Sequence, residues 1–409
     1  MKLLYSFSIL LYNTLVRVAS TWNEKAKKWI EGRKQVFIDL EKRVEHNKPV
    51  CWIHCASVGE FEQARPIIEK IHKQQDYFIL LTFFSPSGIE LRKEYDKADY
   101  VSYIPADTIS NSKKFLDIVK PQIAVFIKYE FWFNYLSELN KRKVDTFLIS
   151  GIFRPSQHFF KPYGIWFKKQ LEAFNHFFIQ NQESQDLLNS IGYANNTVTG
   201  DTRFDRVYEI SKEKYNNTIL EYFCETEKTI IAGSTWGEEH KLILNFVNNV
   251  TNTCKFIIAP HQIHKDEIDK LKNEIGNTGI LFSQCNSIDD LNGKRIIIID
   301  SVGLLSKLYR FADLAIIGGG FGSGIHNTLE PATYGKPILF GPNYSKFQEA
   351  KDLIKKDAAI CFNNYEELKR NLNMLLSDDS KRISFGQNSL EYVKSNLGAT
   401  EKIYEQIFK

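Results

Sequence analysis

The chain has 409 residues, of which 43% are hydrophobic and 25% are charged, the composition of a folded protein rather than a disordered one. The length suffices for two or three domains, and the formal net charge of +4 is too small for a generic nucleic-acid binder. Six cysteines in so long a chain do not form a disulfide framework, which favours free, buried thiols in a reducing cytosol.

The chain begins with an apolar segment that leads into a basic one. Fourteen uncharged residues separate Lys2 from Arg17, and a helix of that length rises about 21 Å, less than the roughly 30 Å hydrocarbon core of a bilayer. The first fifty residues carry a net charge of +5 and include Trp22 and Trp29. This pattern predicts a basic, membrane-associated helix over 1–35. The alternative is a helix packed on the protein's own core.

From residue 50 onward, short apolar segments rich in β-branched residues alternate with helical stretches, which is typical of parallel sheets built from βαβ units. Seven such segments precede residue 205 and seven follow residue 228. They cover 50–57, 77–84, 100–106, 123–128, 146–153, 174–181 and 196–201, then 229–235, 255–260, 279–284, 295–300, 314–320, 337–342 and 358–363.

The charged stretch 207–228 has no strand signal and is predicted to link two domains. We expect an α/β fold with two Rossmann-like, doubly wound domains, over 36–206 and 229–385. A C-terminal helix over 386–409 is expected to pack back on the N-terminal domain. Ligands of such folds bind at the carboxyl ends of the strands, which predicts a central cleft between the domains.

The first predicted strand ends in a turn that leads directly into a helix. Ser57 and Gly59 permit a tight turn and close approach of the backbone. Glu60 either complements the helix dipole or acts as a general base that the dipole keeps ionised by lowering its pKa. After the fourth strand, Lys128 and Glu130 stand either at a pocket rim or in a solvated loop.

The first two strands of the second domain also end in polar residues. Ser234 and Thr235 either help to hold a phosphate or cap a helix. His261 and His264 follow Pro260 and can reach an anion; the lack of a third ligand in the sequence argues against a metal.

The most informative segment is a glycine-rich loop, 318–324, between a strand and a helix. Its main-chain amides, among them those of Gly320, Gly322 and Gly324, are predicted to cradle a phosphate. The segment matches neither the G-x-G-x-x-G dinucleotide fingerprint nor a Walker motif. Asn327 and Glu330 share a helical face, where a carboxylate can accept ribose hydroxyls. This combination suits a nucleotide-sugar donor bound without a metal.

Together these motifs resemble the Kdo transferases, which attach 3-deoxy-D-manno-octulosonic acid (Kdo) from CMP-Kdo to a lipid A precursor. The most specific pieces are HCASVGE at 54–60, YEFWFN at 129–134, VTGDTRFD at 198–205, GSTWGEE at 233–239 and the run from Gly318 to Pro342. The resemblance implies an inverting, metal-independent GT-B enzyme of lipopolysaccharide biosynthesis that needs no cofactor. It also implies that the N-terminus holds the enzyme at the cytoplasmic face of the bacterial inner membrane.

The resemblance also implies roles for individual residues. Glu60 matches the catalytic base and Glu130 a second catalytic acid; the phosphorylated glycolipid acceptor is expected near Ser57, Gly59, Lys128 and Arg154. The CMP-Kdo donor is expected near Ser234, Thr235, Pro260, His261, Gly320, Gly322, Gly324, Asn327 and Glu330.

Three departures from the family pattern affect these expectations. His261 and Gln262 stand where the family commonly has arginine and histidine, Phe133 replaces a proline, and Arg154 is a substitute for a missing family arginine. One alternative is another GT-B enzyme that uses a UDP-sugar, either a glycosyltransferase or an epimerase. A second is a non-enzymatic sugar-binding module at the membrane.

Overall fold

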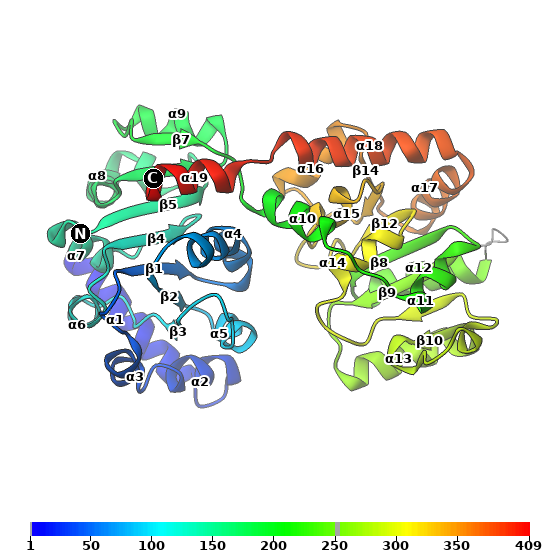
Figure 1. Ribbon diagram of the computed structural model, residues 1–409, viewed down its shortest axis with the longest axis horizontal. Helices are drawn as coiled ribbons and strands as arrows, with labels where there is room; N and C mark the ends of the chain where they lie inside the picture. Colours follow the sequence, from blue (N-terminus) through cyan, green and yellow to red (C-terminus); the bar gives the residue numbers. More distant parts are fainter. Residues whose placement is uncertain (1, 250–253) are drawn as a thin grey trace. The chain divides into compact units, whose positions relative to one another are not determined.

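The computed structural model describes residues 2–249 and 254–409 (Figure 1). The chain folds into two compact units. The N-terminal unit comprises Met1–Arg206 together with Leu397–Lys409, and the C-terminal unit comprises Val207–Asn396.

The N-terminal unit is built on a sheet of seven parallel strands in the order β3-β2-β1-β4-β5-β6-β7. Successive residues of β1 point to opposite faces, so Trp52 belongs to one apolar cluster and Ile53 to another. Both faces of the sheet are therefore buried, as a parallel sheet requires. The strands are β1 (Val50–Cys55), β2 (Phe78–Phe83), β3 (Tyr100–Tyr103), β4 (Ile123–Ile127), β5 (Asp145–Gly151), β6 (His176–Ile179) and β7 (Asn196–Val198).

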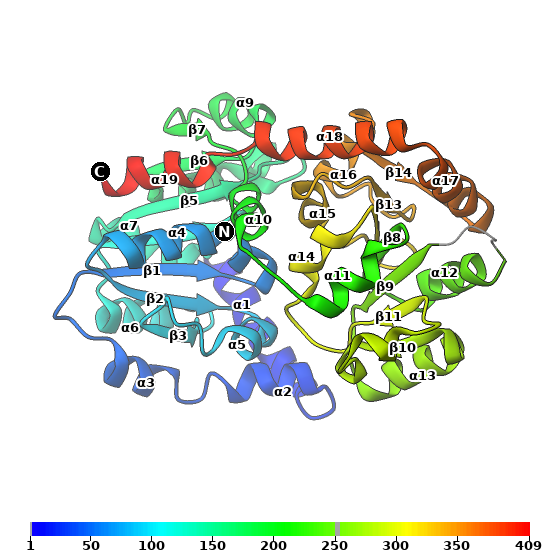
Figure 2. The same ribbon diagram turned by 45° about the vertical axis from the view of Figure 1, so that its right-hand side comes forward.

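Helices cover both faces of this sheet (Figure 2). They are α1 (Lys2–Ala19), α2 (Glu24–Glu31), α3 (Val36–Arg43), α4 (Val58–Gln74), α5 (Pro86–Arg92), α6 (Ile109–Val119), α7 (Phe133–Arg142), α8 (Ile165–Gln170), α9 (Gln182–Ser190) and α19 (Ala399–Phe408); α10 (Arg203–Lys212) begins here and continues into the C-terminal unit.

The last helix, α19, packs on the N-terminal unit beside α4 (Figure 1). Tyr404 is buried, and its hydroxyl accepts a hydrogen bond of 2.7 Å from the side-chain amide of Gln75. Asp205 accepts hydrogen bonds of 2.7 Å from the main-chain amides of Gly398 and Thr400, which satisfies donors at the start of the helix.

Helix α1 is attached to the N-terminal unit through Tyr5. The hydroxyl of Tyr5 donates a hydrogen bond of 2.5 Å to the buried carboxylate of Asp107, and its ring packs edge-on against Phe133. The opposite side of α1 is apolar and exposed: Leu4, Phe7, Leu10, Leu11, Leu15 and Val18 are between 48% and 65% exposed. Within the described residues, no helix has both the length and the apolarity needed to cross a bilayer.

The predicted single helix over 1–35 is two separate helices, and two of its residues turn inward. Trp29 is only 7% exposed, so it does not face outward as the sequence suggested, whereas Trp22 is 74% exposed. Arg33 lies over the ring of Trp29 and donates hydrogen bonds to the carbonyls of Ile104 and Phe84. These two carbonyls and the indole ring hold the guanidinium group against the N-terminal unit. Arg33 is therefore not part of an exposed basic cluster.

The C-terminal unit has a second sheet of seven parallel strands, in the order β10-β11-β9-β8-β12-β13-β14. The strands are β8 (Thr229–Thr235), β9 (Lys255–Pro260), β10 (Gly279–Leu281), β11 (Ile296–Ile298), β12 (Leu314–Ile317), β13 (Ile338–Phe340) and β14 (Ala359–Cys361). The remaining helices are α11 (Thr218–Glu225), α12 (Gly237–Asn249), α13 (Lys265–Ile275), α14 (Leu305–Leu308), α15 (Leu329–Thr333), α16 (Gln348–Lys355), α17 (Tyr365–Ser377) and α18 (Asp379–Ser395).

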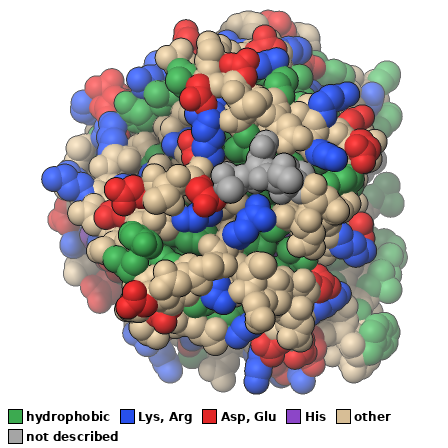
Figure 3. All heavy atoms as spheres, turned by 90° about the vertical axis from the view of Figure 1, so that its right-hand side faces the viewer, with side chains coloured by type: hydrophobic (Ala, Val, Ile, Leu, Met, Phe, Trp, Pro, Cys, Tyr) green, Lys and Arg blue, Asp and Glu red, His purple; other side chains and the backbone are tan. Residues whose placement is uncertain are grey.

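Basic and acidic side chains are interspersed on the face of this unit that Figure 3 shows. All six cysteines of the chain are free, and four of them are buried. Both observations agree with the small net charge and with the absence of a disulfide framework.

Every one of the fourteen predicted strand segments contains a strand. Two predicted boundaries differ from the structure. Residues 207–228 form the end of α10 and all of α11 and belong to the C-terminal unit, so they are not a separate linker. The C-terminal unit ends at Asn396 and not at residue 385, because α18 runs without a break to Ser395.

Candidate active site

Two acidic residues lie at the carboxyl ends of adjacent strands in the N-terminal unit. Strands β1 and β4 are paired, Glu60 follows β1 in the first turn of α4, and Glu130 follows β4. Glu60 is 6% exposed, and its Oε2 accepts a hydrogen bond of 2.5 Å from the main-chain amide of Ala56. The side chain of Glu130 is 12% exposed. The structure therefore brings the two predicted catalytic acids together at one edge of the sheet.

Burial raises the pKa of both carboxyl groups. Hydrogen bonds from the amides of Ala56 and Ser57 and the charge of Lys128 oppose this effect at Glu60, but its pKa still lies above the ordinary value. Burial and then the charge of Glu60 raise the pKa of Glu130 to about 8. The expected depression of the Glu60 pKa is thus wrong, because loss of solvent raises the pKa by more than the amide contacts and Lys128 lower it.

Glu130 also has an ionisable neighbour in His54, whose Nε2 lies 3.9 Å from Oε2 of Glu130. His54 is fully buried, accepts a hydrogen bond of 3.0 Å from the indole of Trp132 and contacts the hydroxyl of Thr82 at 2.9 Å. Burial and the charge of Arg33 lower its pKa to about 3. His54 is therefore neutral near pH 7 and does not supply a compensating positive charge.

The predicted acceptor residues occupy the same edge of this sheet. Lys128 follows β4 with a positive φ of 64°, and Ser57 is the N-cap of α4 without a side-chain capping bond. Gly59 is exposed in the first turn of α4, and Arg154 is exposed after β5. Residues with hydroxyl, ammonium and guanidinium groups thus follow the strands at the same edge as the two acids, a suitable set for a polar, anionic substrate.

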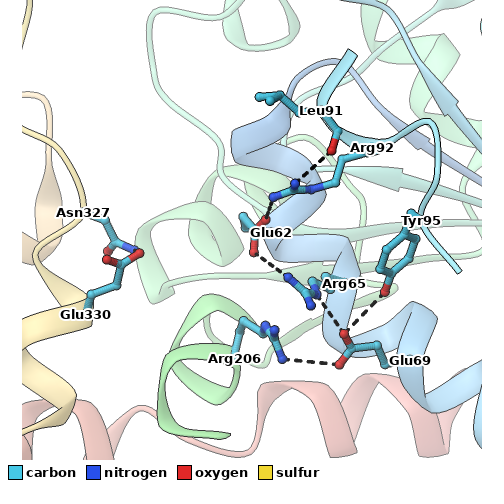
Figure 4. Close-up of polar contacts among 9 residues, drawn as sticks. All are labelled: Glu62, Arg65, Glu69, Leu91, Arg92, Tyr95, Arg206, Asn327 and Glu330. Atoms are coloured by element: carbon cyan, nitrogen blue, oxygen red, sulfur yellow. Dashed lines mark hydrogen bonds and ion pairs between the residues drawn. The ribbon is translucent and has the colours of Figure 1, made fainter. Parts of the chain in front are cut away.

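Four of the predicted donor residues line one cavity of about 270 Å³ in the C-terminal unit: Ser234, His261, Asn327 and Glu330. The side-chain amide of Asn327 donates a hydrogen bond of 3.1 Å to Glu330, the contact drawn in Figure 4. The fixed carboxylate and the polar groups beside it can bind the hydroxyls of a sugar ring.

Two further polar groups in this cavity were not predicted from the sequence. Tyr309 and Ser306 line it, although no motif marked the segment that carries them. Gly233 lies opposite Tyr309, and a Cβ atom at that position would stand 2.0 Å from the tyrosine hydroxyl. The neighbouring Ser234 has a positive φ of 53°, so the backbone turns sharply at the end of β8 to form this wall.

Three aromatic side chains form a stack at this cavity. The ring of His261 lies 4.2 Å from that of His326 and 4.7 Å from that of Trp236, and all three rings are nearly parallel. The indole of Trp236 donates a hydrogen bond of 3.1 Å to Nε2 of His326. His326 belongs to the glycine-loop motif and Trp236 to the GSTWGEE motif, but only the fold shows that they meet.

The glycine-rich loop does not offer the amides that the sequence suggested. The main-chain amides of Gly322 and Gly324 both donate to the carbonyl of Gly319, at 3.0 and 3.2 Å. Gly320 is buried, and a Cβ atom there would stand 2.5 Å from the backbone of Gly341. Two of the three predicted phosphate donors are therefore engaged inside the loop, and the third glycine serves close packing.

A buried carboxylate fastens this loop to the start of α12. Glu239 is 1% exposed; its Oε1 accepts a hydrogen bond of 2.9 Å from the amide of Gly319, and its Oε2 one of 3.1 Å from the amide of Trp236. The sequence motif contains Glu239, but nothing in the local pattern shows that it reaches the loop after β12.

Two other predicted donor residues lie outside the cavity lining. Thr235 is buried with its hydroxyl 2.8 Å from Nε2 of His240, and Pro260 ends β9. Across residues 2–249 and 254–409, no three His, Cys, Asp or Glu side chains gather as metal ligands would.

Comparison with known proteins supports one family. The model of the family described as 3-deoxy-D-manno-octulosonic-acid transferase (kdotransferase) matches residues 31–206. The chain is 26% identical over 389 residues to the 3-deoxy-D-manno-octulosonic acid transferase of Rickettsia prowazekii, covering 91% of this chain and 82% of that protein. It is 27% identical to a bifunctional glycosyltransferase/methyltransferase of Fusobacterium nucleatum, covering 93% of this chain but only 62% of that protein.

Solved structures show the same fold at lower sequence similarity. The UDP-GlcNAc 2-epimerase of Neisseria meningitidis, solved with UDP-GlcNAc bound, superposes with a TM-score of 0.59 at 16% identity, covering 88% of this chain and 99% of that one. The two-unit α/β architecture is thus shared with nucleotide-sugar enzymes of the GT-B type.

Proposed function

Since the comparisons support the Kdo transferase family, whose members are glycosyltransferases, we propose that this chain transfers Kdo from CMP-Kdo to a lipid A precursor of the lipid IVA type. The observation that carries the proposal is the buried Glu60–Glu130 pair at the carboxyl edge of the N-terminal sheet. A reaction of this class needs a group that removes a proton from the acceptor hydroxyl as it attacks the anomeric carbon.

In this mechanism Glu60 is the general base. Glu130, with its pKa of about 8, keeps its proton at neutral pH, so the pair carries one negative charge and Glu60 holds it. Burial raises the pKa of Glu60, which makes it a stronger base than an exposed glutamate. Lys128, whose charge opposes that rise, stabilises the ionised form.

The C-terminal cavity is proposed to bind the cytidylate part of the donor. Glu330, oriented by Asn327, is placed to accept hydrogen bonds from ribose hydroxyls. The polar groups of Ser234, Ser306 and His261 line the same cavity and are available to the phosphate. Because the loop amides of Gly322 and Gly324 are engaged, side chains carry more of this contact than the sequence suggested.

We also propose that helix α1 holds the protein on the cytoplasmic face of the inner membrane. Its exposed apolar side chains, including Phe7 and Leu11, continue into the exposed Trp22 and the basic start of α2. An amphipathic helix of this kind lies in the interface, with apolar side chains in the acyl boundary and lysines near anionic headgroups. A glycolipid acceptor would be met in the same layer.

The proposal is tested by incubating the purified protein with CMP-Kdo and a lipid IVA-type acceptor and weighing the products by mass spectrometry. The expected product is heavier by one or more Kdo residues. A parallel panel of UDP-GlcNAc and CMP-sialic acid tests the alternative of a UDP-sugar enzyme. Transfer or epimerisation with UDP-GlcNAc, and none with CMP-Kdo, would overturn the proposal.

A further inference from the structure

The described lining of the cavity in the C-terminal unit carries no permanent positive charge. Among the described residues that line it, none is a lysine or an arginine, while Glu330 contributes a carboxylate. The phosphate of a nucleotide is an anion that proteins usually meet with fixed cations or main-chain amides. Here the groups able to become cationic in the lining are the imidazoles of His261 and His326.

The two imidazoles are not equivalent. Nε2 of His326 accepts the hydrogen bond from the Trp236 indole, so this nitrogen carries no proton while that bond is made. The ring of His261 is held by stacking and by its main-chain amide, which donates to the carbonyl of Thr235 at 3.0 Å. Protonation of His261 therefore breaks no hydrogen bond that the structure gives its ring.

The other titratable groups around the stack come from four segments. The start of α12 brings Glu239 and His240, both buried, and Glu239 is already bonded to two amides. The loop after β9 adds His264, which is exposed, and the segment before β12 adds the buried Tyr309. The segment after β12 adds Glu330, which binds Asn327.

We propose that His261 takes up a proton when the phosphate of the cytidylate binds, so that donor and product binding in the C-terminal unit is coupled to proton uptake. This proposal rests on the proposed function, since it takes the ligand to be a cytidine nucleotide. It assigns to His261 the role that a fixed arginine cation would have, with the difference that the charge appears only with the ligand.

The pKa shifts of the two stacked histidines support proton uptake by His261 on ligand binding. Partial loss of solvent around the stacked ring lowers the pKa of His261, although the residue as a whole is exposed. Burial together with the charge of His261 lowers the pKa of His326 to about 4. Without ligand both rings are thus neutral at pH 7 and can stack without repulsion. An anion beside His261 favours its charged form, and the proton that it gains then comes from solvent.

The test is titration of the full-length protein with CMP by calorimetry between pH 7 and 8.5, in buffers of different ionisation enthalpy. In this range CMP itself is already largely a dianion, because its second phosphate pKa is about 6. The wild-type protein is expected to take up protons, and its dissociation constant is expected to rise with pH by up to about tenfold per unit. His261→Gln should bind CMP more weakly and without proton uptake; His261→Arg should bind it at all of these pH values without uptake.

The outcomes separate the inference from the proposed function on which it rests. If the wild-type protein binds CMP with no proton uptake, or if uptake persists in His261→Gln, the assignment to His261 is overturned and cytidylate binding still stands. If the folded wild-type protein fails to bind CMP at any of these pH values, the proposed function itself fails. Thermal unfolding of both variants shows whether they are folded; His261 is exposed, so little change is expected.

Discussion

Glu60 and Glu239 occupy the same position in their two units, yet their surroundings give them different roles. Each follows the first strand of its sheet, as the third residue of the helix α4 or α12, and each is buried. Glu239 accepts hydrogen bonds from amides of two different loops, through both of its oxygens. Glu60 stands beside a second acid, and its pKa is raised. The partners of a carboxylate, more than its place in the fold, distinguish a group that fastens a loop from one proposed to move a proton.

The largest effect is expected for Glu60→Gln. This change removes the proposed base but keeps the size and the hydrogen-bonding oxygen of the side chain, so Kdo transfer should fall by about 10² to 10⁴. The rate of product formation is measured by mass spectrometry. CMP binding by the C-terminal unit and the unfolding temperature serve as controls and should change little. Near wild-type turnover would reject the assignment of Glu60.

A second contrast lies between the exposed apolar face of α1 and exposed apolar side chains elsewhere. The double change Phe7→Asp with Leu11→Asp removes two apolar side chains from the proposed interface and should lower binding to anionic vesicles by at least about tenfold. Ile383→Asp is the matched control, because Ile383 is 55% exposed on α18 of the C-terminal unit. Equal loss for both variants, or for neither, would contradict a role of α1.

Much of the fold could be predicted because its signal is local. All fourteen strands followed from apolar, β-branched runs, and the positions of Glu60 and Glu130 after buried strands placed both acids at the strand ends. Their catalytic roles came from the family resemblance and not from these positions. The contacts that could not be predicted join segments distant in the sequence: Tyr5 with Asp107, and Trp236 with His326. The pKa of Glu60 also depends on burial by the whole unit, so the local helix dipole predicted the wrong direction.

Glu239→Gln is expected to lower the stability of the protein, whereas Glu60→Gln is expected to lower the transfer rate and leave stability nearly unchanged. An amide has one oxygen where the carboxylate has two, so either the Gly319 or the Trp236 amide loses its acceptor and faces a second donor. The free energy of unfolding should fall by about 1–3 kcal/mol. Chemical denaturation measures this change, and CMP affinity should fall with it. A fully stable variant would show that the bridge between the two loops is dispensable.

The smallest effect is expected in the ion-pair network on the flank of α4, shown in Figure 4. Glu69 accepts from Arg65 at 2.8 Å and from Arg206 at 3.5 Å, and these side chains are partly exposed. Because solvent screens such pairs, Glu69→Gln should cost about 1 kcal/mol or less in unfolding free energy and leave transfer unchanged. Denaturant unfolding and the transfer assay measure the two quantities. A large loss of transfer would show that this network belongs to the acceptor site.

The central claim is that Glu60 carries the negative charge of the pair while Glu130 keeps its proton. Its most direct test is the pH dependence of Kdo transfer by the wild-type protein and by Glu130→Gln. Burial and the charge of Glu60 raise the pKa of Glu130 to about 8, so the wild-type pair loses its proton as the pH rises through that region, and the wild-type rate should fall there. The variant has no proton to lose in this range and should lack this fall. At pH 7 the variant should keep much of its activity, because glutamine resembles the protonated acid. Identical profiles for the two proteins would contradict a catalytic pair in which Glu60 carries the charge and Glu130 the proton.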